Sequence, residues 1–257
     1  MSLDSPLPDE DEPIVITDDL LDTTPSEERR DFERGISALP PVTLTLIALN
    51  VGVFCWQVAS GALDNVQALV AAGALDRAHV MRGEYWRLVS SMFLHGGAEH
   101  LIGNCLALYV LGMACEHALG WWRALAVYLL CGVAGSLASV FVEPGPTVGA
   151  SGAVFGFMGC VTGFLRRHRD RFYVRDARIG VVLGCWAIWQ FASGWFNPRI
   201  AVMAHIGGFA AGSILGFVAR GPLIAEVENE LGDSSQIEHP TYLDDLPADR
   251  FPSCDAD

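Results

Sequence analysis

Long runs without Asp, Glu or Arg dominate the middle of the sequence, which also contains no lysine. Four of these runs hold 19 to 22 residues each, and two further apolar segments precede them. A helix needs about 20 apolar residues to cross a bilayer, because each residue advances it by about 1.5 Å. We therefore expect an all-α, polytopic membrane protein with six transmembrane helices, in the segments 43–59, 100–119, 124–142, 144–165, 179–198 and 200–219.

Acidic charge is concentrated at the two ends of the chain. The net charge is −14 although 51% of the residues are hydrophobic. Residues 1–37 hold 12 Asp and Glu against three Arg, and residues 221–257 hold ten against one. We expect two acidic, disordered cytoplasmic tails, 1–37 and 221–257, the second with room for a short helix around 223–231. The net positive middle, 38–220, is the expected membrane domain, and nucleic acid is not an expected partner.

Arginine sets the expected orientation in the membrane. The segment 166–178, between the fourth and fifth runs, carries six arginines and should therefore be cytoplasmic. By parity both termini are then cytoplasmic, and the second, fourth and sixth helices run inward from the outer face. His100, Ser151 and His205 lie near the outer ends of these three helices, the last two roughly 8–10 Å below the outer end.

The fourth run opens with the motif Gly149-Ala150-Ser151-Gly152. The upstream pair Gly145-Pro146 interrupts any earlier helix, so Ser151 should lie in the first turns of a new one. Free N–H groups and the helix dipole favour negative charge there, and the glycines allow close approach, which suits a serine nucleophile. Taken alone, such a motif more often marks a small-residue face for helix packing than a nucleophile.

The second and sixth runs supply further polar side chains. His100 and Asn104 are four residues apart and share one helical face. His205 is followed by Gly208 and Gly212, which would let the sixth helix approach the glycines of the fourth. This packing would place His205 against Ser151, with the Phe155 ring stacked on the imidazole. A histidine that stands alone in a membrane helix is more often a buried hydrogen-bonding residue than a catalytic one.

Taken in order, the motifs of the middle region resemble those of the rhomboid intramembrane serine proteases. The resemblance covers nearly all of 40–220 and rests on Trp86-Arg87, His95, His100-Leu101-Ile102-Gly103-Asn104, Gly112-x-x-x-Glu116-x-x-x-Gly120, Gly149-Ala150-Ser151-Gly152, and Ala204-His205 with Gly208 and Gly212. With no seventh run visible, the chain is similar to the six-helix form common in bacteria. Phe155 stands where some members have tyrosine, which keeps the ring and loses the hydroxyl.

The resemblance implies a serine endopeptidase of the bacterial plasma membrane that cleaves transmembrane segments of other proteins near the outer leaflet. Ser151 would be the nucleophile, His205 the base, and His100 and Asn104 oxyanion donors together with the Ser151 N–H. The expected supporting residues are Gly149, Gly152, Phe155, Gly208, Gly212, Trp86, Arg87 and Glu116.

A Ser–His dyad is expected rather than a triad. Between 144 and 219 the only acids are Asp170 and Asp176, both in the expected cytoplasmic loop. Glu99 and Glu143 lie near the expected outer surface, and their assistance to His205 stays open.

Other functions remain to be weighed against proteolysis. A catalytically inert rhomboid-like protein that binds membrane clients would keep the helices and lose Ser151 or His205, and both are present. A six-helix transporter could use His100 and His205 as a proton relay, although no inverted repeat is visible. No His-Glu-x-x-His motif occurs, so no metal or other cofactor is expected. The expected partners are transmembrane protein substrates and the lipid bilayer.

Overall fold

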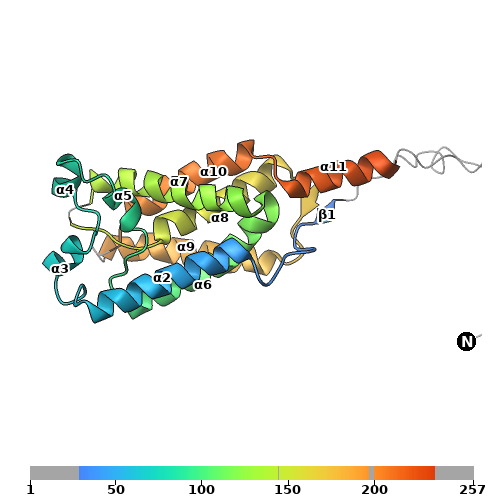
Figure 1. Cartoon of the computed structure of the whole chain (residues 1–257). Helices are drawn as coiled ribbons and strands as arrows, with labels where there is room; N and C mark the ends of the chain where they lie inside the picture. Colours follow the sequence, from blue (N-terminus) through green and yellow to red (C-terminus); the bar gives the residue numbers. More distant parts are fainter. Residues whose placement is uncertain (1–28, 144, 197–199, 235–257) are drawn as a thin grey trace, which may run out of the picture.

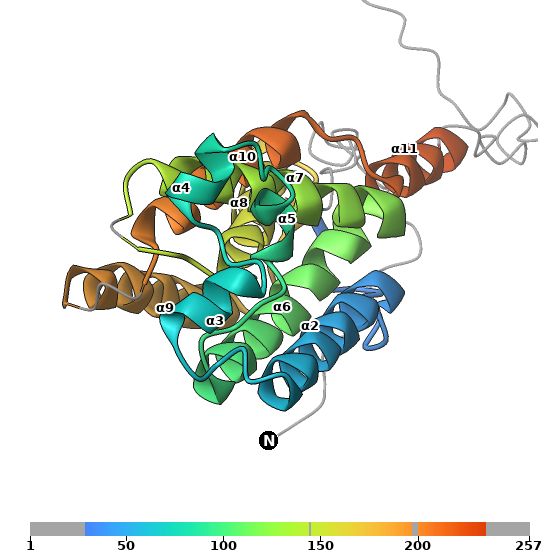
Figure 2. The ribbon, with the colours of Figure 1, turned by 60° about the vertical axis from the view of Figure 1, so that its left-hand side comes forward.

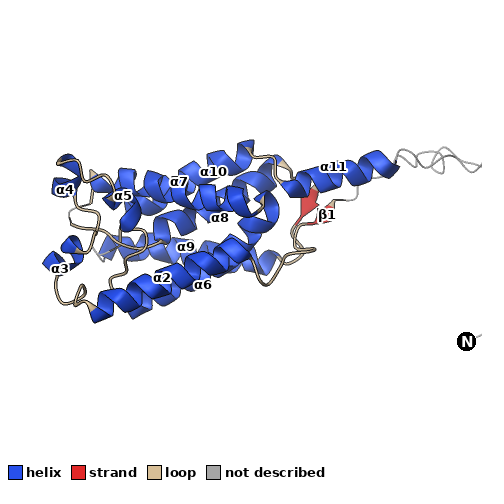
Figure 3. Ribbon diagram, in the orientation of Figure 1, coloured by secondary structure: helices blue, strands red, loops and turns tan. Residues whose placement is uncertain are grey.

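The computed structural model describes residues 29–143, 145–196 and 200–234. Within these residues the chain is almost entirely helical, as Figure 3 shows by colour. Six long helices form one bundle: α2 (Pro41–Ala59), α6 (Ala98–Leu119), α7 (Trp121–Val140), α8 (Ser151–Arg167), α9 (Ala177–Phe196) and α10 (Val202–Val218). The short helices α3 (Val66–Ala71), α4 (Arg77–Met81) and α5 (Arg87–Ser90) lie at one end of the bundle (Figure 1). Helix α11 (Pro222–Ser234) and strand β1 (Arg30–Asp31) lie at the other end, and Figure 2 shows α9 at the edge.

A long helix overlaps each of the six predicted apolar segments, which confirms the helical part of the prediction. Among the described residues, four helical stretches are long and apolar enough to cross a membrane: Pro41–Ala59, Ala98–Leu119, Trp121–Val140 and Val202–Asn229. The last stretch includes α10 and most of α11. Helix α8 has 17 residues, and the described apolar part of α9, Gly180–Gln190, is shorter. The number of membrane crossings therefore stays a prediction.

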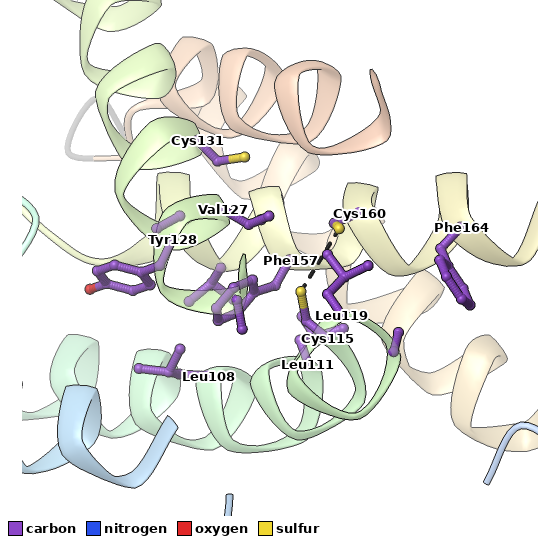
Figure 4. Packing of buried hydrophobic residues seen from close by; sticks show 14 of the residues in the cluster. Leu108, Leu111, Cys115, Leu119, Val127, Tyr128, Cys131, Phe157, Cys160 and Phe164 are labelled. Carbon is purple, nitrogen blue, oxygen red and sulfur yellow. Dashed lines mark hydrogen bonds between the residues drawn. The ribbon is translucent and has the colours of Figure 1, made fainter. Parts of the chain in front are cut away.

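The hydrophobic core lies between α6, α7 and α8. Figure 4 shows side chains from these three helices pointing toward one another, and those labelled are Leu108, Leu111, Cys115, Leu119, Val127, Tyr128, Cys131, Phe157, Cys160 and Phe164. The dashed line joins the sulfur atoms of Cys115 and Cys160, which are 3.8 Å apart. Burying these apolar groups against one another fixes α6 beside the two helices that follow it.

Helices α8 and α10 pack with their backbones in contact, as the glycine spacing predicts. A Cβ atom added to Gly208 would fall on the carbonyl oxygen of Gly152, and one added to Gly212 would fall on that of Gly156. One turn further along, Gly216 lies in the same way against Cys160. Glycine is required at these positions because any side chain would push the two helices apart.

Glu116 closes the bundle at the end opposite α3 and α4. Its carboxylate accepts hydrogen bonds from the N–H groups of Val42 and Thr43, at 3.1 and 3.0 Å, and from the Thr43 hydroxyl at 2.9 Å. These N–H groups belong to the first turn of α2 and have no partner within that helix. Glu116 is therefore a helix cap supplied by another helix, placed away from Ser151.

The packed domain begins earlier than the sequence indicated. Strand β1 pairs in parallel with β2 (Phe172–Tyr173), which lies between α8 and α9. Phe32 is buried and its ring contacts those of His117, Phe164 and Phe172. The expected tail 1–37 is thus wrong for the packed residues 30–32, because one large apolar side chain anchors an otherwise acidic segment. Residues 1–28 and 235–257 of the expected tails lie outside the described residues.

The C-terminal side of the membrane domain also continues further than expected. Helix α11 covers the predicted short helix around 223–231, and its side chains Leu223, Ile224 and Val227 are buried in the core. On its outer side, Glu228 forms an ion pair with Arg171 at 2.9 Å. The helix therefore packs against the bundle rather than belonging to an unstructured tail.

Candidate active site

Ser151 is the first residue of α8, and the loop before it is held in an extended form. Leu75 and Thr147 form an antiparallel bridge, with N–O distances of 3.0 and 2.9 Å in the two directions. Gly149 has φ +125° and donates its N–H to the Ser91 carbonyl at 2.9 Å. Residues with side chains rarely adopt this φ, so the turn into the helix depends on glycine. The helix accordingly starts at Ser151, in agreement with the prediction that Ser151 lies in its first turns.

His205 lies opposite Ser151, in the first turn of α10. Its Nε2 atom is 2.9 Å from the Ser151 Oγ, and its side chain is 2% exposed. The glycine contacts of α8 and α10 start at Gly152 and Gly208, immediately beyond this pair. The predicted proximity of the two side chains is therefore confirmed, and its cause is the backbone contact between the helices.

An aromatic ring fixes the plane of the imidazole. The rings of Phe155 and His205 are stacked, with centroids 4.3 Å apart and planes 13° from parallel. Phe155 lies one turn beyond Ser151 on α8, so it reaches the histidine that contacts the serine. The predicted stack is present, and it restricts how far the imidazole can tilt.

His100 and Asn104 lie beside the backbone just before the serine. A Cβ atom added to Gly149 would be 2.7 Å from His100 Nε2 and 3.4 Å from Asn104 Nδ2. Asn104 is buried, and its Nδ2 atom has no hydrogen-bond partner among the described residues. Helix α6 thus presents two N–H-bearing groups to the loop that carries Ser151, as the spacing of four residues predicts.

The loop before α6 is held by a residue that the sequence did not single out. Gln57 of α2 accepts a hydrogen bond from the His95 N–H at 2.9 Å and donates one to the His95 carbonyl at 3.1 Å. The His95 ring is fully buried and lies edge-on to His100, with centroids 5.2 Å apart. Gln57 therefore positions the start of α6 from a separate helix, a contact that no local pattern reveals.

A small cavity adjoins Ser151, and its lining residues come from α7, α8, the start of α10 and the loops before α6, α8 and α10. It holds about 20 Å³, and the hydroxyl-bearing residues Ser91, Ser136 and Thr147 are among its lining residues. A site of this size and polarity has room for a water molecule. The Ser136 hydroxyl donates to the Leu88 carbonyl at 3.0 Å, which ties the cavity wall to the loop containing α5.

Comparison with known proteins identifies the family. Residues 82–222 match the family described as the rhomboid domain. The chain is also 32% identical over 219 residues to the rhomboid protease AarA of Providencia stuartii, an alignment that covers 72% of this chain and 73% of AarA.

The chain belongs to the rhomboid family. It is 35% identical over 188 residues to the rhomboid protease GluP of Bacillus subtilis, and 38% identical over 157 residues to RHOMBOID-like protein 5 of Arabidopsis thaliana. These alignments cover 72% and 60% of this chain, but only 36% of GluP and 50% of the Arabidopsis protein. Family membership and the apolar helices together identify an integral membrane protein with several membrane-spanning helices.

Two residues of the rhomboid domain predicted to support the site act at a distance from it. Arg87 is buried, donates to the carbonyl groups of Val70 and Ala74, and pairs with Glu84 at 2.8 Å. Its guanidinium lies 4.6 Å from the Trp86 ring centroid. Arg87 therefore ties α3 to α5. The residue after α5, Ser91, accepts the hydrogen bond from the Gly149 N–H. The support reaches the loop before Ser151 through the backbone.

Glu99 and Glu143, whose assistance to His205 the sequence did not decide, differ in their positions. Glu143 accepts a hydrogen bond from the Met203 N–H at 3.1 Å, so it caps the start of α10, two residues before His205. Glu99 is in the first turn of α6.

Among the described residues, no group of three or more His, Cys, Asp or Glu is arranged to hold a metal ion.

Proposed function

We propose that this rhomboid-family chain is an intramembrane serine endopeptidase that cleaves transmembrane segments of other membrane proteins. The observation that carries the proposal is the 2.9 Å contact between Ser151 Oγ and His205 Nε2. A serine hydroxyl within hydrogen-bond reach of an imidazole is the usual arrangement of an activated nucleophile and its general base. The relatives named as rhomboid proteases support the same reaction class.

In the acylation step, Ser151 Oγ attacks the scissile carbonyl carbon while His205 Nε2 takes the hydroxyl proton. The tetrahedral intermediate collapses when the C–N bond breaks, and His205 delivers that proton to the leaving amine. The product is an ester between the substrate and Ser151. The Phe155 stack keeps Nε2 directed at the reacting oxygen throughout.

The negative oxygen of the intermediate requires donors that are already in place. His100 and Asn104, together with the Ser151 N–H at the start of α8, are suitable because they surround the Gly149 backbone. The Asn104 Nδ2 atom is a buried donor without a partner among the described residues, so it gains a hydrogen bond when the oxyanion forms. Preorganised donors of this kind lower the barrier without reorganising during the reaction.

Hydrolysis of the ester needs water beside Ser151. The cavity of about 20 Å³ supplies a place for one molecule next to the nucleophile. His205 accepts a proton from this water as it attacks the ester carbonyl, and returns the proton to Ser151 Oγ when the acid product leaves. The site thereby returns to its starting state.

The site opens toward the outer face of the plasma membrane of a bacterial cell. Six helices cross the bilayer, and the arginine segment 166–178 and both termini lie in the cytoplasm. The membrane domain, 38–220 together with the packed residues just before it and helix α11 after it, carries an acidic tail at each end of the chain. In intact cells, Asp64→Cys should react with a membrane-impermeant thiol reagent and Asp176→Cys should not. The reverse pattern would place the site on the cytoplasmic side.

The reaction class is tested by labelling with a fluorophosphonate, which forms a stable ester with an activated serine. Wild type should be labelled, and both Ser151→Ala and His205→Ala should lose the label although they remain folded. Labelling that survives Ser151→Ala would point to another nucleophile. Chelators should leave labelling unchanged.

A further inference from the structure

A third aromatic ring extends the stack at His205. The ring centroids of Phe155 and Trp186 are 5.3 Å apart and the ring planes are 21° from parallel. Phe155 also stacks on His205, at 4.3 Å and 13°. These residues come from α8, α9 and α10, so three separate helices contribute to one stack.

Helix α9 has few other contacts with the bundle among the described residues, chiefly with α10. Leu183 and Trp186 pack against the core, while Val181, Ile188 and Trp189 are exposed on the helix surface. Trp186 is therefore a main point of contact between α9 and the helices that carry the proposed nucleophile and base.

We infer that Trp186 is a positioning residue for His205, acting through Phe155; the inference rests on the proposed function. A histidine ring turns about its Cβ–Cγ bond, and this rotation would carry Nε2 away from Ser151 Oγ. The Phe155 ring limits the rotation only as long as it is itself held in place. Trp186 holds it, because a stacked aromatic contact opposes rotation and tilting of both partners.

The reactivity of Ser151 consequently depends on how α9 is seated. With Trp186 against Phe155, His205 is aligned for proton transfer. Without that ring, the imidazole samples more orientations, and a smaller fraction of molecules is ready to react at any moment. The expected effect is on the chemical step rather than on binding.

The test compares three single variants with wild type in the same detergent or bilayer. Trp186→Leu removes the ring, Trp186→Phe keeps a smaller ring, and Trp189→Leu is the matched control on the lipid-facing side of α9, where Trp189 is 68% exposed. The measured quantities are the maximal inactivation rate constant, kinact, and the half-saturating concentration, KI, for a small fluorophosphonate. Such a probe needs His205 as base and does not need a transmembrane substrate to bind.

We expect Trp186→Leu to lower kinact about two- to tenfold with KI unchanged, from the usual strength of an aromatic pair. Trp186→Phe should recover most of the loss, and Trp189→Leu should match wild type. Because Trp186 acts through Phe155, adding Trp186→Leu to Phe155→Leu should lower kinact no further. Unfolding temperatures check the fold, and Trp186→Met replaces the leucine variant if that variant does not fold.

The outcomes separate the inference from the proposal beneath it. If wild type is not labelled at Ser151, the proposed function fails and the inference fails with it. If wild type is labelled and Trp186→Leu has the same kinact, or changes only KI, the inference alone is overturned. A loss of kinact equal in Trp186→Leu and Trp189→Leu would also overturn it, since the effect would then be a general one of α9.

Discussion

Helices α8 and α10 meet through their backbones, whereas the described residues of α9 meet the bundle through side chains such as Leu183 and Trp186. Cβ atoms added to Gly208, Gly212 or Gly216 would fall on carbonyl oxygens of α8. Cβ atoms added to Gly180 or Gly184 of α9 would meet nothing within 4 Å. Glycine therefore marks an obligatory close contact in α10 and open space in α9.

This contrast divides the work of the candidate site. The backbone contact between α8 and α10 sets the distance between Ser151 and His205, and it cannot relax without separating the helices. Helix α9 is held near its start by β2 and the residues that pair with it, where Arg175 lies 3.4 Å from Asp31 and 3.3 Å from Glu33. It is held again at Trp186. The geometry at His205 therefore depends both on the fixed contact of α8 with α10 and on the seating of α9.

The largest expected loss of stability comes from a substitution in the segment around Phe32, which packs near the start of α9. Phe32→Ala should lower the free energy of unfolding by about 3–5 kcal/mol, because it empties a buried aromatic position between three rings. The control is Leu39→Ala, which is 75% exposed and should change stability by about 0.5 kcal/mol or less. Unfolding in mixed micelles measures both, and equal stability of the two variants would contradict the packed position of Phe32.

The second prediction concerns Asn104 of α6, which lies beside the backbone just before Ser151. Asn104→Ala should lower kcat about 10²- to 10³-fold, the usual cost of one lost oxyanion donor. Ile102→Ala is the matched control on the same helix, with a side chain that is 58% exposed, and should retain normal turnover. Turnover on one substrate is compared for both. If Asn104→Ala is as inactive as Ser151→Ala while folded, Asn104 has a role in proton transfer that we have not assigned.

A pair of glycine substitutions examines the contrast itself. Gly208→Ala should lower the free energy of unfolding by about 1–3 kcal/mol and reduce turnover, since its Cβ would separate α10 from α8. Gly184→Ala should be neutral or stabilising by up to about 1 kcal/mol, because alanine favours a helix and the space is open. Unfolding midpoints of the two variants decide the matter. Similar losses in both would remove the distinction between the two helices.

The smallest effect is expected from the ion pairs below α9. Arg175 is 67% exposed, so its attraction to Glu33 is screened by water and salt. Glu33→Gln should lower the free energy of unfolding by about 1 kcal/mol or less, and the loss should shrink at high salt. A loss as large as that of Phe32→Ala at low salt, most of it removed by high salt, would show that charge rather than apolar packing holds this segment.

Much of this architecture could be predicted from local sequence. Uncharged segments gave the helices, and the glycines after Ser151 and His205 predicted that the two side chains would meet. The spacing of four residues between these glycines indicates which faces of α8 and α10 are in contact. The positions of His100 and Asn104 on one face followed from helical periodicity alone.

The remaining contacts join distant parts of the chain and leave no local pattern. The bridge between Leu75 and Thr147 pairs a single residue on each side, too short for strand periodicity. Phe32 is one aromatic residue within an acidic segment, so composition pointed to a tail. Gln57 and Trp186 are ordinary residues of apolar helices until the neighbours they contact are known.

The central claim is that Ser151, activated by His205, hydrolyses a peptide bond within a membrane segment. The most direct measurement is cleavage of a model single-span substrate by purified protein in a bilayer, with wild type and Ser151→Ala side by side and folding checked for both. We predict that wild type produces two fragments cut near the outer end of the span, and that Ser151→Ala produces none. Cleavage by Ser151→Ala, or intact substrate with folded wild type in every bilayer and detergent tried, would contradict the account.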